Sequence, residues 1–134
     1  MRLLTLALPI IVLCGCSKSS SSGATGVTAA EVGVYSLQSL NSAPLPTSIS
    51  EGGVPVEVTA GTLTLSAGNG LQISTTFRQT PGASPQTRVV SGKYQLTGTS
   101  LAFTYTNGGA NSGTLNGTTI QMTNEGIVWA YRRN

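Results

Sequence analysis

The chain has 134 residues, enough for one domain, and its seven basic and four acidic residues give a formal net charge of +3. It contains no histidine, and its four acidic residues are all glutamates. A Ser-His-Asp triad therefore cannot be built, and the usual ligands of zinc and other transition metals are missing. The weak charge argues against a nucleic-acid partner. We expect a protein that is not an enzyme and that holds no metal ion or cofactor.

The first fifteen residues have the pattern of a signal peptide. Arg2 precedes an apolar run from Leu3 to Leu13. About eleven apolar residues are too few to cross a bilayer, which needs roughly twenty, but they match the core of a signal peptide. Gly15, a small residue, then stands directly before Cys16.

The sequence Leu13-Cys14-Gly15-Cys16 resembles the lipobox of bacterial lipoproteins. The resemblance implies cleavage before Cys16 and acylation of its sulfur and its amine, so that a covalent lipid anchors the protein to a bilayer. Ser17 follows, where a lipoprotein retained in the inner membrane would carry aspartate. The resemblance thus implies a cell-envelope protein on the outer membrane, facing the periplasm. The alternative is an ordinary secretory signal with two incidental cysteines.

Residues 16–31 form the expected tether. After Cys16 they are mostly Ser, Gly, Ala and Thr with no periodic apolar face, which predicts a flexible segment. Both cysteines of the chain lie at or before the start of this tether. The domain that follows, residues 32–134, is therefore expected to contain no disulfide.

The domain alternates apolar and polar residues with a period of two, which is typical of β-strands with one buried face. Asn69-Gly70 and Asn116-Gly117 stand between alternating runs and predict tight hairpin turns, as does the segment from Gly98 to Ser100. A change of parity at Ala60-Gly61 predicts a β-bulge. The earlier strands are predicted at residues 33–40, 45–50 and 54–66.

These elements predict an all-β domain of eight or nine short strands. Successive hairpins favour a small up-and-down antiparallel β-barrel of about eight strands, because closure covers the apolar face and leaves no free edge. The alternative is a β-sandwich. An eight-stranded barrel is either filled by its own side chains or has room for one small ligand.

The domain also resembles the small lipocalin-like β-barrels of bacterial lipoproteins. The resemblance rests on Gly33-Val34-Tyr35, Ser39-Leu40-Asn41, Pro44-Leu45-Pro46, Ser91-Gly92-Lys93-Tyr94, Leu101-Ala102-Phe103 and Val128-Trp129-Ala130-Tyr131-Arg132-Arg133. Lipocalins stack an arginine of the last strand on a tryptophan of the first. Here Tyr35 stands at the tryptophan position, and Arg132 or Arg133 can supply the cation. The resemblance implies a closed barrel that binds an apolar molecule.

The inward phase of the predicted strands supplies the candidate ligand-binding residues. Arg88 is the one charged residue in phase with an inward face. It either binds a ligand carboxylate at the barrel mouth or extends from the strand end into water. The inward aromatic residues, which either fill the core or line a pocket, are Phe77, Tyr94, Phe103, Tyr105 and Trp129.

The glutamates are not expected to form a catalytic pair. Glu57 alternates with two valines and should face outward, while Glu51 and Glu125 lie in predicted turns. A carboxylate pair for glycoside hydrolysis is therefore not expected.

Together these features predict a monomeric, lipid-anchored envelope protein whose non-catalytic barrel binds a small apolar ligand. The alternative is an envelope module that binds or inhibits another protein. An enclosed apolar void of roughly 300 Å³ or more would favour a ligand. A filled barrel with an exposed apolar patch would favour a protein partner.

Overall fold

A computed structural model describes residues 30–79 and 82–134, so Cys16, the predicted signal peptide and nearly all of the tether lie outside the described residues. The described part contains no helix with the length and apolar character needed to cross a membrane. Its ten strands are β1 (Gly33–Leu40), β2 (Ala43–Pro44), β3 (Thr47–Glu51), β4 (Val54–Ser66), β5 (Gly70–Arg78), β6 (Gln86–Thr97), β7 (Ser100–Tyr105), β8 (Ala110–Asn116), β9 (Thr119–Asn124) and β10 (Ile127–Arg133).

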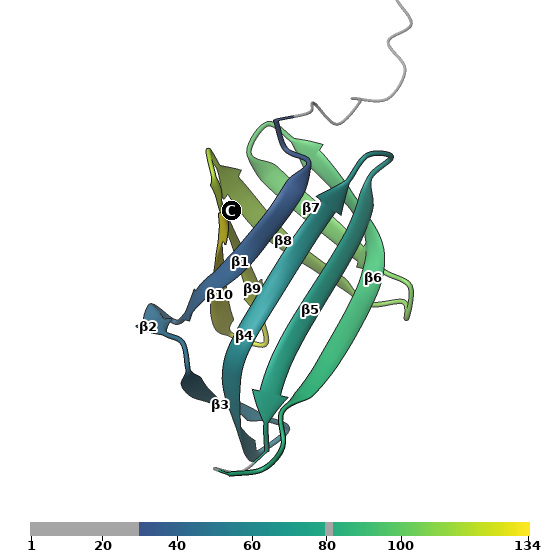
Figure 1. The fold of residues 1–134 in the computed structure, drawn as a ribbon. Helices are drawn as coiled ribbons and strands as arrows, with labels where there is room; N and C mark the ends of the chain where they lie inside the picture. The colour runs from purple at the N-terminus through teal and green to yellow at the C-terminus, as the bar shows by residue number, and fades with distance from the viewer. Residues whose placement is uncertain (1–29, 80–81) are drawn as a thin grey trace, which may run out of the picture.

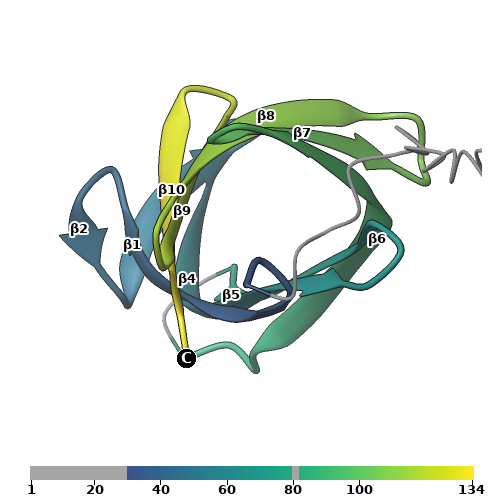
Figure 2. The ribbon, with the colours of Figure 1, turned by 90° about the horizontal axis from the view of Figure 1, so that it is seen from above.

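Eight of the strands close into an antiparallel barrel (Figures 1 and 2). From β3 to β10 each strand pairs with the next along the chain, and β10 then pairs with β1. The ring closes because β1 also pairs with β4, where Tyr35 lies opposite Leu63. The short strands β2 and β3 pair with β1 and β4 and are additional to the ring. The predicted all-β barrel of about eight strands is confirmed, and the sandwich alternative is wrong.

Period-two alternation sends one face of each strand into the barrel. In β7, Leu101 and Phe103 are buried while Ala102 and Thr104 are exposed. The turn predicted at Asn69-Gly70 forms between β4 and β5, with Asn69 at a φ of 65°. Asparagine tolerates this left-handed conformation better than most residues, so the local sequence determines where the hairpin turns.

Two local predictions need correction. Residues 45–50 do not form one strand, because β2 ends at Pro44 and β3 begins at Thr47, with the Leu45-Pro46 segment between them. Prolines have no N–H to donate to a strand ladder, so they separate the two strands. The β-bulge predicted at Ala60-Gly61 lies slightly earlier, between Val58 and Ala60, where the register against β5 shifts.

The described chain begins at the top of the barrel in Figure 1. Buried side chains fill this end. We call it the upper end, and the opposite end the lower end. Tyr94 and Phe103 lie opposite each other in the β6–β7 register and are only 2% and 1% exposed. The buried cluster to which they belong also includes Tyr35, Leu63, Leu65, Leu71, Leu101 and Ile120, each exposed by 4% or less.

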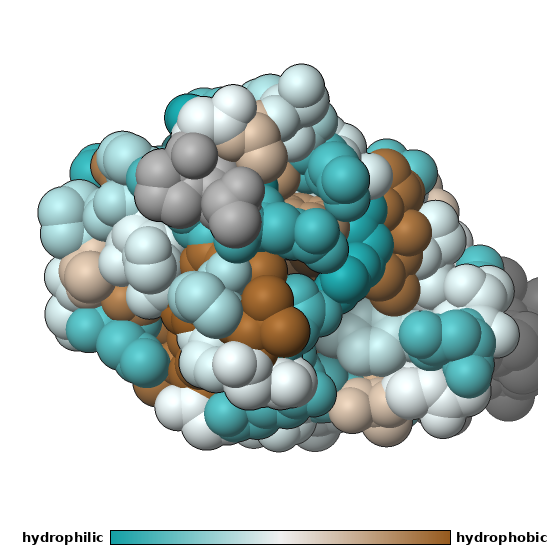
Figure 3. Space-filling view, turned by 90° about the horizontal axis from the view of Figure 1, so that it is seen from below, coloured by the Kyte–Doolittle hydropathy of each residue, from teal (hydrophilic) through white to brown (hydrophobic). Residues whose placement is uncertain are grey.

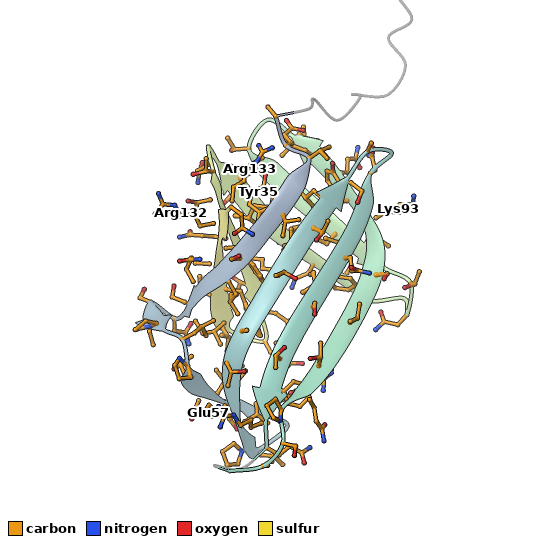
Figure 4. The ribbon with its side chains drawn as sticks, viewed as in Figure 1. Tyr35, Glu57, Lys93, Arg132 and Arg133 are labelled. Carbon is orange, nitrogen blue, oxygen red and sulfur yellow. The ribbon has the colours of Figure 1, made fainter. Side chains whose placement is uncertain are left out.

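The first described residues are held across the upper end. The hydroxyl of Tyr35 donates a hydrogen bond of 2.9 Å to the backbone oxygen of Glu31. The guanidinium of Arg133 donates to the backbone oxygens of Ala30 and Val32. Its central carbon lies 6.0 Å from the centre of the Tyr35 ring (Figure 4). Of the two arginines predicted for this contact, only Arg133 makes it.

Candidate ligand-binding cavity

Unequal strand lengths leave the lower end hollow. Strands β4 and β6 have 13 and 12 residues, whereas β7, β8 and β9 have six or seven. The last pair between β6 and β7 joins Gly92 to Tyr105. Residues 86–91 of β6 continue beyond it and pair only with β5. The long strands therefore project past the short ones at the lower end, as Figure 1 shows.

A cavity of about 250 Å³ occupies this end. Figure 3 looks into it from below and shows a hollow with hydrophobic and hydrophilic side chains at its edge. Its wall consists mainly of aliphatic and aromatic side chains, with Ile49 contributed by β3 and Trp129 by β10. The apolar lining residues are Ile49, Val56, Val58, Ile73, Phe77, Val90, Tyr105, Met122, Ile127, Trp129 and Tyr131.

Polar side chains gather at the mouth of the cavity. They come from the end of β3, from β5 and the lower part of β6, from the end of β9, and from the turns that follow β7 and β9. The polar and charged lining residues are Ser50, Glu51, Thr75, Arg88, Asn107, Asn124 and Glu125. An apolar interior with a few polar groups at its opening is the usual composition of a small-molecule site.

Arg88 is held by two contacts at the mouth. Its Nη1 atom donates a charge-assisted hydrogen bond to Oε1 of Glu51, at a distance of 2.5 Å. The central guanidinium carbon lies 5.2 Å from the centre of the Phe77 ring. The side chains of Arg88 and Glu51 are 56% and 41% exposed, so water still reaches both. The sequence left open whether Arg88 binds a carboxylate or extends into water; in the structure its carboxylate partner belongs to the protein.

The predicted ligand-binding residues divide into two groups. Phe77, Arg88 and Tyr105 line the cavity, as does the further inward aromatic residue Trp129. Tyr94 and Phe103 lie in the filled upper half and do not line it. Cys16, the predicted lipidation site, lies outside the described residues.

Two of the glutamates also lie at this site. Glu51 and Glu125, which were expected in turns, both line the mouth. Glu57 does not line it and instead pairs with Arg78, with Nε and Oε2 3.4 Å apart. No group of three or more metal-ligating side chains of the His, Cys, Asp or Glu type occurs within residues 30–79 and 82–134.

No family model, curated protein or solved structure matches this chain.

Sequence reasoning missed most of the cavity wall. Ile49, Met122 and Ile127 occupy inward positions, but nothing local distinguishes them from residues that fill the core. A meander brings every second turn to the same end of a barrel. The order of the predicted hairpins therefore contained a signal that could have placed Asn107 and Glu125 together at one mouth.

Burial changes the acidity of two tyrosines in the wall. It raises the pKa of Tyr131 well above the ordinary value, and the nearby hydroxyl of Tyr105 raises it further. Burial also raises the pKa of Tyr105, while a hydrogen bond with the Asn111 side chain lowers it in part. Both phenols therefore remain neutral around neutral pH. They add rings and uncharged hydroxyl groups to the cavity, and no negative charge.

Proposed function

We propose that this protein is a lipid-anchored lipoprotein of the cell envelope whose barrel binds a small apolar ligand without transforming it. The observation that carries the ligand proposal is the half-filled barrel. Its upper half is closely packed, whereas its lower half contains an apolar cavity with a polar mouth. The anchoring proposal rests on the lipobox at Leu13–Cys16.

The size of the cavity limits the ligand. Its volume of about 250 Å³ lies just below the roughly 300 Å³ at which small-molecule sites usually begin, and it is open at the mouth instead of enclosed. One water molecule takes up about 30 Å³ in the liquid, so the space suits roughly eight to ten non-hydrogen atoms. A short alkyl chain or a single ring system with one polar group meets this limit.

The described surface gives less support to a protein-binding module. Its large exposed hydrophobic residues are Val34, Val54, Val89 and Val128, at 42%, 51%, 54% and 38% exposed. Val34 and Val128 lie toward opposite ends of the β1–β10 pair. Strands β4 and β6, which carry the other two, are separated by β5. Scattered single valines are ordinary surface features, and only a contiguous apolar patch would indicate a partner.

Ligand binding can be measured through Trp129, which lines the cavity and is the only tryptophan of the chain. Titration of the full chain, carrying Cys16→Ala to prevent lipidation, with 1-octanol should change its fluorescence saturably. Val90→Phe fills space inside the cavity and should weaken binding by about tenfold or more. The matched control is Val89→Phe, because Val89 is the next residue on β6 and faces outward.

Equal binding by the two phenylalanine variants, or no saturable response to 1-octanol in the unaltered barrel, would contradict the ligand proposal. Urea unfolding of each variant checks that the barrel is intact.

A further inference from the structure

The charges at the mouth indicate which head group a ligand can carry. Resting on the proposed ligand-binding function, we infer that the cavity selects ligands with a hydrogen-bond-donating head that is uncharged or cationic, such as an alcohol or an ammonium group. Ligands with a carboxylate head are discriminated against.

The charged residues that line the cavity sum to a negative value. Arg88 is the only cation among the lining residues that the structure describes, and Glu51 and Glu125 are the anions. One positive and two negative charges give a net charge of −1. Arg78 is the other arginine near this end, but it does not line the cavity and is paired with Glu57.

The guanidinium of Arg88 is already paired with a carboxylate of the protein, Glu51. Glu51 ends β3 and Arg88 lies on β6, and the sheet order places β4 and β5 between these two strands. Their 2.5 Å ion pair therefore links strands that do not pair with each other. Contact with the Phe77 ring holds the guanidinium from a second direction.

A ligand carboxylate would meet an unfavourable arrangement. To bind Arg88 it would have to displace Glu51 or share the guanidinium with it, and either result places like charges close together. Like-charge contacts at a binding site commonly weaken the binding of the wrong ligand and so give the site its specificity. An ammonium or hydroxyl head, in contrast, can donate hydrogen bonds to the carboxylates already present at the mouth.

Three probes of equal chain length test the inference: octylammonium, 1-octanol and octanoate, titrated against the Cys16→Ala chain at about pH 7 and followed by Trp129 fluorescence. Octylammonium and 1-octanol should each bind at least about tenfold more tightly than octanoate.

Glu125→Gln should weaken octylammonium binding and strengthen octanoate binding by roughly threefold to fivefold, with 1-octanol binding unchanged. The matched control is Glu57→Gln, which removes a carboxylate that does not line the cavity and should leave all three affinities unchanged.

The outcomes separate this inference from the function on which it rests. Octanoate binding as tight as 1-octanol binding, and lost in Arg88→Gln, would show that Arg88 is a site for anions and would overturn the inference alone. Failure of all three probes to bind would overturn the proposed function and this inference with it.

Discussion

Arg88 is held at the mouth of the cavity by an ion pair with Glu51 and by contact with the Phe77 ring. Alternation along β6 correctly indicated that its side chain lies on the inward face, at the mouth. Its partner Glu51 lies 37 residues earlier, on a strand that does not pair with β6. No local pattern connects the two residues, so the sequence suggested a ligand carboxylate or water as the partner of Arg88, and the barrel supplies a glutamate.

Tyr131 gives a prediction at the same scale, because it is 1% exposed and burial raises its pKa. The folded pKa lies above the unfolded value of about 10, so the neutral phenol stabilises the fold fully below pH 10, and this contribution is lost as the pH rises above 10. Raising the pH from 8 to 11 should therefore lower the free energy of unfolding. In Tyr131→Phe the loss should be smaller by about 1.4 kcal/mol, because one group no longer ionises on unfolding.

Urea unfolding at the two pH values measures this difference. Ultraviolet absorbance at pH 11 provides the check, because a folded protein in which all four tyrosines were ionised would contradict the expected burial effect.

Among the strands, the bounds were easier to predict than the pairing partners. Alternation and turn residues predicted β1 and β4 with the bounds that the structure shows, because both signals are local. The same signals did not predict that β1 leaves β4 after Ser36, or that β3 pairs with the lower part of β4 in its place. That exchange depends on pairing between distant segments, and it contributes Ile49 and Glu51 to the cavity.

Gly92 marks the point where β6 passes beyond the end of β7. A Cβ atom placed there would collide with the backbone oxygen of Thr104 and lie 3.0 Å from the Cα of Tyr105. Backbone atoms on a neighbouring strand cannot move aside cheaply, so Gly92→Ala should lower the free energy of unfolding by about 2–3 kcal/mol. The control is Gly70→Ala, where the nearest contact is the Cβ of Ser66 at 3.3 Å and the expected loss is under about 1 kcal/mol.

Urea denaturation of both variants measures the comparison. Equal stability of Gly92→Ala and the unaltered chain would mean that the strands can separate at this point at little energetic cost.

At the scale of the whole molecule, the two ends of the barrel differ: the upper end is filled, and the lower end contains the cavity. The described chain begins at the filled upper end, and the cavity opens at the lower end, so the point at which the proposed tether would join the barrel lies away from the mouth. Binding and anchoring would then occupy opposite ends of one barrel. This separation follows from the closed topology, because an up-and-down barrel with strands of unequal length has two different ends.

Anchoring itself is tested by changing one thiol at a time. Cys16→Ala should release the protein from the membrane fraction and abolish palmitate labelling, because the variant lacks the sulfur atom to which the lipid would be attached. The proposed two or three acyl chains would otherwise hold the protein firmly on the bilayer. Cys14→Ala is the matched control, two residues earlier, and should remain labelled and membrane-bound. Continued labelling of Cys16→Ala would show that the lipid is attached elsewhere or that the lipobox interpretation is wrong.

The sequence by itself determined the all-β class, the barrel of about eight strands and most hairpin positions, because alternation and turn chemistry act over only a few residues. The contact between Tyr35 and a C-terminal arginine was suggested by the resemblance to lipocalins, and the structure assigns it to Arg133. Only the tertiary structure decided that Tyr94 and Phe103 fill the core while Phe77, Tyr105 and Trp129 line a cavity. All five residues alternate in the same inward phase, and what separates them is their height along a barrel whose strands differ in length. Height and strand length arise from pairing between distant segments, and the same pairing brought Glu51 to Arg88.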